Sequence, residues 1–479
     1  QAFFLKNVPG PAMARVIGAS TAEAGACLAD LSGPTDSAGS AALDTCRPTE
    51  QIELPDCAEH TSFVPGKRGP SDVEVGKVRS EWYHTSLLLV ADVVGTGVLS
   101  LPGHFAGLGL TSGLMLLLSC ALINSYTGWL LSRCKALCPQ ARTLSDLASQ
   151  VLGPRSAYMV HALVYCYIFF GCGNYLLVLS KSLQSIFPGM CRPFAGLVGC
   201  ACLIWPNAIR TLTSIAPISI ISNSAIVVAI AVCLITLLSL SPASHGQDLS
   251  NIPAAAGAPS TTFWSTFSAV SGAIFAFSGQ KIYLEIMSEM RDVGDFTYAL
   301  GAAMGLIAGL YTITCVVVYH ARGVQSPTYL LDVLDVDRRT FASGLMFVHV
   351  GISYVISQQV LCRAIHAWLS PERAEAILAG DADYWQSRLE WLTITTLIMV
   401  SAWTVSNLVP FFADFVSLMG ALASAPLSFL WPAILFVAAQ RKEKRIGLQG
   451  ADLFLVPCCY VMSVLITLLG TMSSLLDLY

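Results

Sequence analysis

The chain has 479 residues, of which 54% are hydrophobic and only 12% are charged. Soluble domains carry about 25% charged residues, so this composition excludes an ordinary soluble protein and favours helices that face lipid. The formal net charge of -4 and the lack of a Lys/Arg stripe between aromatic residues argue against a nucleic-acid partner.

Residues 1–80 differ from the rest of the chain. They are rich in Gly, Pro, Ser and Ala, carry scattered acidic residues and show no helical or alternating period. This composition is typical of a segment that cannot form a packed core. We therefore predict a disordered cytoplasmic N-terminal tail over residues 1–80 and a transmembrane domain over residues 81–479.

Eleven apolar segments follow the tail, and a helix that crosses the hydrocarbon needs about 20 such residues. We predict an all-α polytopic membrane protein with eleven transmembrane helices. The segments lie at roughly residues 85–107, 111–132, 157–180, 194–209, 213–240, 262–288, 297–320, 341–365, 390–409, 411–438 and 452–476.

The Lys and Arg residues of the connections predict the orientation. With the tail inside, the inner connections hold thirteen of these residues and the outer ones hold five. Positively charged connections stay on the cytoplasmic side. We therefore expect a cytoplasmic N-terminus and, after eleven crossings, an extracellular or lumenal C-terminus.

Two segments are interrupted at mid-depth. The first contains Gly95-Thr96-Gly97, with Asp92 about one turn earlier, and the sixth contains Ser271-Gly272 and Ser278-Gly279-Gln280. Glycine weakens a helix, and backbone groups released at membrane depth must line a cavity or be covered by protein. Broken helices at these places predict an interior polar site.

The two interrupted segments are the first and the sixth. This spacing is expected if segments 1–5 (about 85–240) and 6–10 (about 262–438) are inverted repeats around a site at the midplane, with the eleventh (about 452–476) added outside the repeat. The alternative interpretation is that the glycines only allow helices to pack closely.

Short motifs in both interrupted segments resemble those of the amino acid/auxin permease family. Gly95-Thr96-Gly97-Val98-Leu99-Ser100-Leu101-Pro102 is similar to the family signature of the first helix. Phe275-Ala276-Phe277-Ser278-Gly279-Gln280 and the acidic stretch after it resemble the sixth helix. Trp205-Pro206, followed by Arg210, matches the connection between helices four and five more loosely. The resemblance covers residues 82–479 and does not extend to the tail.

This resemblance implies a leucine-transporter-like fold with eleven helices and secondary active transport of amino acids. Family members usually couple transport to protons, and some branches use sodium. Branches that use sodium commonly carry Asn four residues before the Gly-x-Gly, where this chain has Ala91. We therefore expect protons as the coupling ion.

The first break is the candidate site for the substrate carboxylate. The half-helix that follows it presents free N–H groups and the positive end of its dipole, which suit an anion. We assign Gly95, Thr96 and Gly97 to this role.

The sixth segment is the candidate site for the substrate ammonium. Opened carbonyls around Phe275, Ala276 and Phe277 would accept its hydrogen bonds, with Ser278 beside them and an aromatic ring as the wall of the side-chain pocket.

Two carboxylates are candidates for proton coupling. Asp92 should face the interior, because a charge in lipid is costly, and desolvation would bring its titration toward the working range. The alternative is a structural carboxylate bonded to a neighbouring helix. Glu285 lies four residues after Lys281, so it either titrates or forms a static pair with that lysine.

Other polar groups in the segments favour simpler interpretations. His161 and His349 are solitary histidines, which more often form interior hydrogen bonds than proton relays. Ser353 and Ser357 could contribute to a sodium site, but single serines are common in membrane helices. Cys134 and Cys138 lack the further ligands of a zinc site. We predict no metal and no cofactor.

The sequence as a whole predicts a proton-coupled amino acid transporter that works by alternating access, in the plasma membrane or in a vacuolar or lysosomal membrane. A sodium-coupled carrier, or a sensor that binds an amino acid and signals through its tail, would have a similar pocket. An enzyme is disfavoured because the segments contain neither His-x-x-x-His nor Gly-x-Ser-x-Gly. A channel is disfavoured because rings of acidic or carbonyl groups are not evident.

Overall fold

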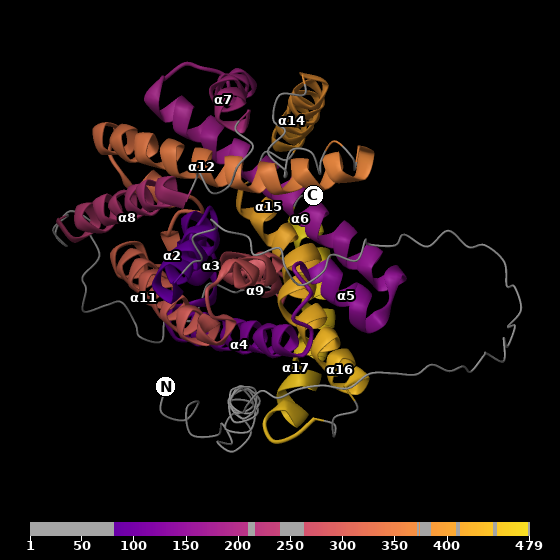
Figure 1. Ribbon diagram of the computed structural model, residues 1–479. Coiled ribbons are helices and arrows are strands. Elements are labelled where there is room, and N and C mark those ends of the chain that lie inside the picture. Colours follow the sequence, from indigo (N-terminus) through magenta and orange to yellow (C-terminus); the bar gives the residue numbers. More distant parts are fainter. Residues whose placement is uncertain are drawn as a thin grey trace, which may run out of the picture. The chain divides into compact units, whose positions relative to one another are not determined.

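The computed structural model describes residues 81–208, 216–239, 263–370, 373, 385–408, 412–443 and 448–477. Within these ranges the chain is helical and contains no strand (Figure 1). The predicted tail over residues 1–80 lies outside them.

Eight helical segments of this part are long and apolar enough to cross a membrane. A ninth is a bent pair, α2 (Trp82–Val93) and α3 (Gly97–Leu108), whose axes differ by 63°. The structure thus confirms an all-helical, polytopic membrane protein. The eight straight segments are α4 (Leu110–Leu137), α6 (Pro154–Ile186), α8 (Ala216–Ser239), α11 (Phe296–Arg322), α12 (Val336–Leu369), α14 (Trp385–Leu408), α15 to α16 (Phe412–Met419 to Trp431–Lys442) and α17 to α18 (Asp452–Leu465 to Thr471–Asp477).

The two remaining predicted segments are also helical but do not meet this length criterion. The fourth corresponds to α7 (Arg192–Asn207), which has 16 residues. The sixth corresponds to α9 (Phe263–Phe277) and α10 (Tyr283–Glu289), joined by the short helix η4 (Gln280–Ile282). Each predicted segment therefore has a helical counterpart, and the first and sixth are interrupted.

One helix was not predicted. α5 (Leu144–Leu152) lies in the connection between α4 and α6 and is too short to cross a membrane. It begins with a capping box, in which the Thr143 hydroxyl accepts from Asp146 N and the Asp146 carboxylate accepts from Thr143 N. This Thr-x-x-Asp pattern is a helix start signal. Membrane spans are predicted from hydrophobic length, so a short helix of this kind is not detected in that way.

The two interrupted helices pack directly against each other. α3 runs along α9, and a Cβ atom on Gly97 would lie 2.6 Å from the Cα of Ala276. A Cβ on Gly279, in the second break, would lie 2.8 Å from a methyl carbon of Val93 at the end of α2. Only glycine allows these approaches, so the glycines of both breaks also bring the two breaks together.

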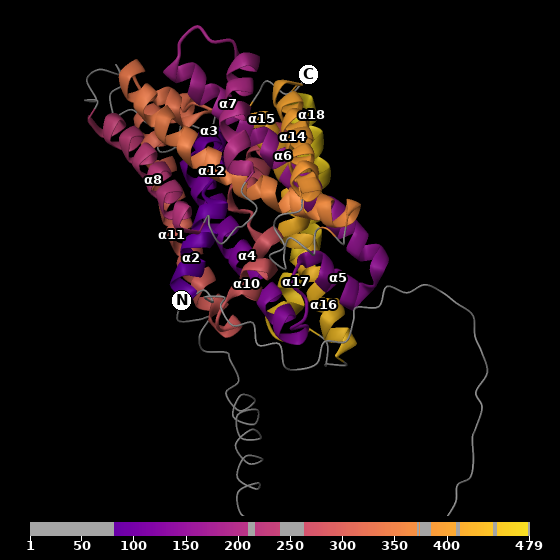
Figure 2. The ribbon, with the colours of Figure 1, turned by 45° about the horizontal axis from the view of Figure 1, so that its top comes forward.

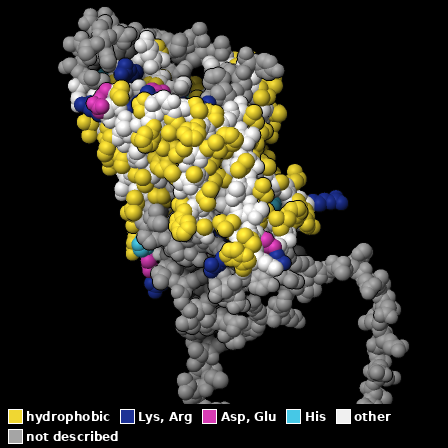
Figure 3. All heavy atoms as spheres, turned by 90° about the horizontal axis from the view of Figure 1, so that it is seen from above, with side chains coloured by type: hydrophobic (Ala, Val, Ile, Leu, Met, Phe, Trp, Pro, Cys, Tyr) yellow, Lys and Arg dark blue, Asp and Glu magenta, His cyan; other side chains and the backbone are white. Residues whose placement is uncertain are grey.

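The outward faces of the helices carry large hydrophobic side chains. Met115, Leu118, Ile235, Leu238 and Leu397 are each more than half exposed. In Figure 3 such side chains cover most of the visible flank of the bundle, and the Lys, Arg, Asp and Glu side chains gather near its ends. Exposed apolar surface on this scale is expected of a protein surrounded by lipid.

Polar contacts join the connections at one end of the bundle. Lys135, at the end of α4, donates to Ser288 of α10 at 2.9 Å. Lys442, at the end of α16, donates to Gln150 O of α5 at 2.9 Å. Figure 2 shows α5, α10 and the start of α17 near this end.

A second set of contacts joins other connections. Arg192, at the start of α7, donates to Ser406 O at the end of α14. Thr340, at the start of α12, donates to Ser185 O at the end of α6 at 3.2 Å. An eleven-helix topology places all partners of the first set on one side of the membrane and all partners of the second set on the other.

Candidate functional site

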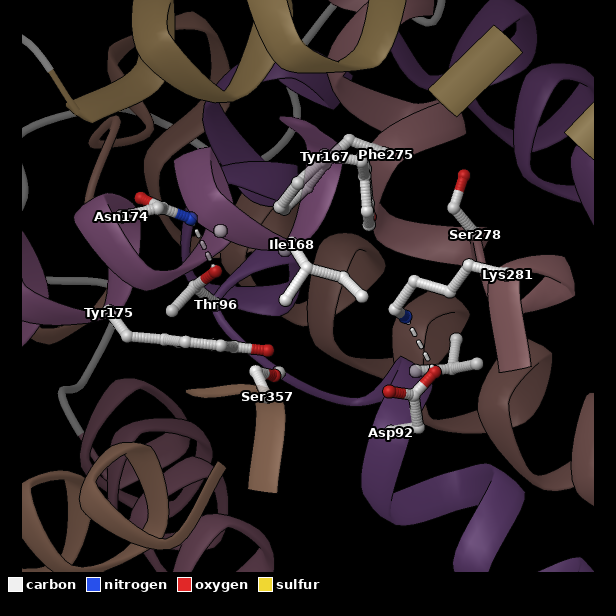
Figure 4. Close-up of a pocket in the computed structure, with 14 residues that line it drawn as sticks. Asp92, Thr96, Tyr167, Ile168, Asn174, Tyr175, Phe275, Ser278, Lys281 and Ser357 are labelled. Carbon is white, nitrogen blue, oxygen red and sulfur yellow. Dashed lines mark hydrogen bonds and ion pairs between the residues drawn. The ribbon is translucent and has the colours of Figure 1, made fainter. Parts of the chain in front are cut away.

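A cavity lies between the two helix breaks and is closed on its other sides by α6 and α12 (Figure 4). The cavity is narrow in this conformation, with a volume of about 30 Å³, which leaves room for ordered water but not for an amino acid, so a substrate would require the helices around the breaks to move apart. Its lining consists of Asp92, Val93, Gly95, Thr96, Gly97, Tyr167, Ile168, Gly171, Asn174, Tyr175, Phe275, Ser278, Lys281 and Ser357.

The cavity contains an ion pair between the two breaks. Lys281 Nζ lies 2.7 Å from Asp92 Oδ2, and the two side chains are only 11% and 14% exposed. The ammonium also lies 5.4 Å from the centre of the Tyr167 ring. Lys281 therefore pairs with Asp92, and a static pair with Glu285, one of the two alternatives for that carboxylate, is not among the ion pairs of the described residues. The sequence spacing suggested an i,i+4 contact, but Lys281 lies in η4 and Glu285 in α10, so one regular helix does not carry both residues.

Each charge of the pair lies at a helix end where the helix dipole has the same sign as the charge. Asp92 is in the last turn of α2, where the helix dipole is negative, and Lys281 precedes the start of α10, where it is positive. Each mismatch costs roughly 0.3 to 1 kcal/mol when exposed and more when buried. The two charges therefore depend on each other, and loss of either charge leaves the other poorly placed.

A hydrogen bond from α6 holds the first break. Asn174 Nδ2 donates to Thr96 Oγ1 at 2.6 Å, and both side chains are almost fully buried. The Asn174 Oδ1 atom is buried and has no hydrogen-bond partner among the described residues. Asn174 thus fixes the Thr96 side chain and retains an acceptor beside the cavity.

Five of the seven predicted substrate residues line the cavity, namely Gly95, Thr96, Gly97, Phe275 and Ser278. Asp92 lines it as well.

Ala276 and Phe277 are not among the lining residues. Ala276 packs against Gly97, and the fully buried Phe277 ring contacts the Tyr311 ring with centroids 5.0 Å apart. Of the two aromatic residues, Phe275 therefore forms the cavity wall.

The carbonyls at the end of α9 already accept hydrogen bonds. Phe275 O accepts from Ser278 N, Ala276 O accepts from the Tyr311 hydroxyl, and Ile274 O accepts from Ser278 Oγ. A carbonyl oxygen can accept two bonds, so these groups keep one further acceptor site each.

A buried polar network supports the second break. The Gln280 amide donates to Asn124 Oδ1 at 2.8 Å and to Thr127 Oγ1 at 3.0 Å, both on α4. Its oxygen accepts from Gly279 N and from Ser428 Oγ, at 3.0 and 2.9 Å. All four hydrogen-bonding positions of this amide are occupied, so the interrupted segment is held in one conformation inside the helix bundle.

Of the other candidate residues, Ser357 lines the cavity and the rest do not. Glu285 is on α10 and is not part of the cavity lining. His349 of α12 is fully buried and its Nδ1 lies 2.9 Å from Ser222 Oγ of α8. The exposed His161 packs on the Tyr165 ring with centroids 4.3 Å apart. Ser353 donates to His349 O, whereas Ser357 lines the cavity.

The sequence patterns did not identify the contributions of α6. Tyr167, Ile168, Asn174 and Tyr175 line the cavity, at positions 167/168, 171 and 174/175 of one helix. This i, i+3/i+4, i+7 spacing places them on one face. The sequence did contain a signal for this face, because Tyr167, Asn174 and Tyr175 are polar or phenolic residues on one side of a membrane helix. The signal was missed because aromatic residues in an apolar span resemble residues that only pack against other helices.

A helical bundle with membrane-length segments and one charge-paired cavity between two broken helices defines an integral, multi-pass membrane protein with an interior polar site. Residues 78–476 match the family described as "Transmembrane amino acid transporter protein", and the chain belongs to this family. This assignment confirms the resemblance seen in the sequence.

Three relatives illustrate the similarity. The chain is 26% identical to the N amino acid transport system protein of Neurospora crassa over 420 residues, which cover 84% of this chain and 85% of the relative. It is 25% identical to amino acid transporter AVT3B of Arabidopsis thaliana, with 84% and 95% covered. It is 24% identical to amino acid transporter AVT3C of the same plant, with 89% and 96% covered.

Proposed function

We propose that this protein carries amino acids across a membrane by secondary active transport coupled to protons, through alternating access. The observation that supports this proposal most is the cavity at the two helix breaks, which the Asp92–Lys281 ion pair crosses. Family membership supports amino acids as the substrate class. Ala91, at the position where sodium-coupled relatives carry Asn, favours protons over sodium.

The proposal includes a leucine-transporter-like fold with eleven membrane crossings and a cytoplasmic N-terminus. The helical counterparts of all eleven predicted segments support it. The contacts between connections support it too, because Lys135–Ser288 and Arg192–Ser406 each join connections that this topology places on the same side. The connections on the side of Lys135 and Ser288 carry the excess of basic residues, which favours this side as the cytoplasmic one.

The substrate's shared amino acid group would lie between the two breaks. The N-terminus of α3 at Gly97 offers N–H groups without an intrahelical acceptor, which suit the carboxylate. On the other side, the remaining acceptor sites at Phe275 O and Ser278 Oγ suit the ammonium. The Gly97–Ala276 contact holds α3 and α9 close together, which supports a small substrate over a large one.

The lining favours substrates with uncharged side chains. Among the described residues of the lining, the one acid, Asp92, and the one base, Lys281, neutralise each other, so neither is a free counter-ion for a charged substrate side chain. The other walls are aromatic or aliphatic, with Tyr167, Ile168 and Phe275 around the space. A cationic or anionic side chain would be desolvated without compensation.

Protonation of Asp92 provides the coupling step. While Asp92 is ionised, it holds the Lys281 ammonium at 2.7 Å. A proton on Asp92 removes this attraction, so the second break that carries Lys281 is no longer held to the end of α2 and can move when the substrate binds. Substrate binding then stabilises the protonated state by the same free energy, as thermodynamic linkage requires. Return of the empty carrier follows deprotonation and re-formation of the pair.

Counterflow in proteoliposomes tests the transport activity. We expect saturable exchange of labelled neutral amino acids, such as alanine or leucine, and little exchange of lysine or glutamate. An inward proton gradient should drive accumulation, and a sodium gradient at equal pH should not. Absence of saturable exchange for every amino acid would refute transport, and accumulation driven by sodium alone would refute proton coupling.

The coupling step is tested with Asp92→Asn. This change keeps the shape of the side chain but removes its titration, so exchange should persist while proton-driven accumulation is lost. His349→Gln is the matched control, because His349 is another buried titratable group and lies outside the cavity lining. Accumulation that survives in Asp92→Asn but disappears in His349→Gln would assign the coupling to the histidine.

A further inference from the structure

A second pocket lies on the surface between α5, α16 and α17, near one end of the bundle, where these three helices meet (Figure 2). It has a volume of about 560 Å³ and opens to the surface. Its lining consists of Val151, Leu152, Ile434, Val437, Ala438, Arg441, Lys442 and Tyr460. We call it the α5 groove. It shares no residue with the cavity at the helix breaks.

The walls and the rim of the α5 groove differ in chemistry. Along α16, Ile434, Val437 and Ala438 come first, and Arg441 and Lys442 follow at the end of the helix. At 1.5 Å per residue, the cations stand roughly 10 Å further along the axis than Ile434. The apolar residues of α16 and α17 in the walls belong to two candidate membrane spans, Phe412–Lys442 and Asp452–Leu476, whereas Val151 and Leu152 come from α5. The groove is therefore apolar at membrane depth and cationic at the membrane boundary.

The two cations at the rim of the groove have hydrogen-bond donors that are not engaged within the described residues. Among the described residues, Arg441 has no hydrogen bond or ion pair, and both Arg441 and Lys442 are exposed. Lys442 donates to Gln150 O, in the last turn of α5, which fixes the ammonium across the groove. An ammonium has three donors, so two remain. Glu443 follows in the sequence and is exposed, but it is not part of the groove lining.

We infer that the α5 groove binds an anionic phospholipid, with its phosphate at Arg441 and Lys442 and one acyl chain along Val437 and Ile434. The order of groups in such a lipid, an anion followed by hydrocarbon, matches the order of groups along α16. A soluble anion would leave the apolar walls exposed, and a peptide would have to enter the hydrocarbon region. Basic residues directly beside a membrane helix contribute about 1 kcal/mol each to binding of anionic lipid.

On the orientation proposed above, which the loop charges support, this end of the bundle lies on the cytoplasmic side, where membranes carry their anionic lipids. A bound lipid would join α5 to α16 and α17 and so stabilise this end of the bundle. The inference does not depend on the transported substrate, because lipid retention is measured without transport.

Native mass spectrometry of the purified full-length chain tests the inference, with phosphatidylserine and phosphatidylcholine of identical acyl chains as probes. We expect phosphatidylserine to be retained preferentially. Arg441→Gln should weaken its binding about fivefold, the effect of one cation near the membrane surface. Arg142→Gln is the matched control, because Arg142 is an exposed cation that precedes α5 but does not line the groove.

The groove itself is tested with Val437→Trp, which fills the apolar wall and leaves every charge in place. This variant should also lose the lipid, and Ala438→Phe tests the same wall if the tryptophan variant does not fold. Soluble glycerophosphoserine should not compete, because it lacks the acyl chain. Equal retention of both lipids, equal loss in Arg142→Gln and Arg441→Gln, full binding in the filled variant, or occupation by a second copy of the chain would each overturn the inference.

Discussion

The hydroxyl of Tyr311 lies 2.9 Å from the carbonyl oxygen of Ala276, at the end of α9. The same hydroxyl lies 3.1 Å from Val93 O, at the end of α2. One side chain from α11 therefore reaches the C-terminal carbonyls of both interrupted helices. Both carbonyls stand where their helices stop, and at membrane depth no lipid group can replace a missing donor. Val93 O also accepts from Gly95 N at 2.9 Å, so Ala276 O depends more on Tyr311.

Tyr311→Phe should weaken both the fold and transport. The substitution removes the hydroxyl that donates to Ala276 O, whereas Val93 O keeps the Gly95 N–H, and an unsatisfied buried group costs about 1 to 3 kcal/mol. We expect a lower melting temperature in detergent and slower counterflow. The matched control is Tyr319→Phe on the same helix, whose ring contacts Phe105 and which is only partly buried. Equal behaviour of the two variants would show that the hydroxyl does not support the breaks.

The ion pair predicts unequal effects of its two members. Lys281→Met leaves the Asp92 carboxylate ionised, partly buried and at the negative end of α2, and an unpaired buried charge costs about 3 to 5 kcal/mol. Asp92→Asn is milder, because its partner Lys281 can still contact the Tyr167 ring. We therefore expect Lys281→Met to be less stable than Asp92→Asn.

The double variant Asp92→Asn/Lys281→Met should recover much of the stability that Lys281→Met loses. A thermal-stability cycle of the four proteins measures the coupling directly. Additive effects of the two substitutions would contradict a direct pair. Proton-driven accumulation should remain absent in the double variant, because neither titratable group is left.

The sequence predicted the positions of the helices well, because hydrophobic length is a strong constraint in lipid. It also located both breaks, because Gly95, Gly97 and Gly279 lie where a helix is interrupted or where two helices approach closely. It did not predict the partner of Lys281. Spacing along the chain favoured Glu285, whereas Asp92 lies 189 residues away in sequence and becomes its neighbour only through the packing of α2 against the second break.

The residues of α6 were missed for a related reason. Asn174 and Tyr175 contribute to the cavity only because α6 packs beside the first break, and a single sequence contains no information on which helices are neighbours. Conversely, Ala276 and Phe277 lie in a recognisable motif, but one faces Gly97 and the other packs on Tyr311. A motif therefore located the break without resolving which side chains face the cavity.

Gly97→Ala should impair folding or transport strongly. Its Cβ would lie 2.6 Å from the Cα of Ala276, so α3 and α9 would have to separate. Gly107→Ala is the matched control on the same helix, because a Cβ there meets no atom within 4 Å. Alanine has the higher helix propensity, by about 1 kcal/mol, so the control should be neutral or slightly stabilising. Melting temperature and counterflow rate distinguish the two variants, and wild-type behaviour of Gly97→Ala would mean that the contact is not maintained in the membrane.

Gln280→Met should cost more stability than any single hydrogen bond explains. The substitution keeps the volume of the side chain but removes the partner of Asn124, Thr127, Ser428 and the Gly279 N–H group at once. Because several of these groups then stay buried without a partner, we expect a loss of about 3 kcal/mol or more in unfolding free energy. Gln184→Met is the control, since the Gln184 amide donates one hydrogen bond, of 3.1 Å, to Met190 O, and the loss of this bond should cost only about 1 kcal/mol. If the two variants melt at the same temperature, water replaces the lost partners of Gln280, and the second break is more hydrated than its buried network indicates.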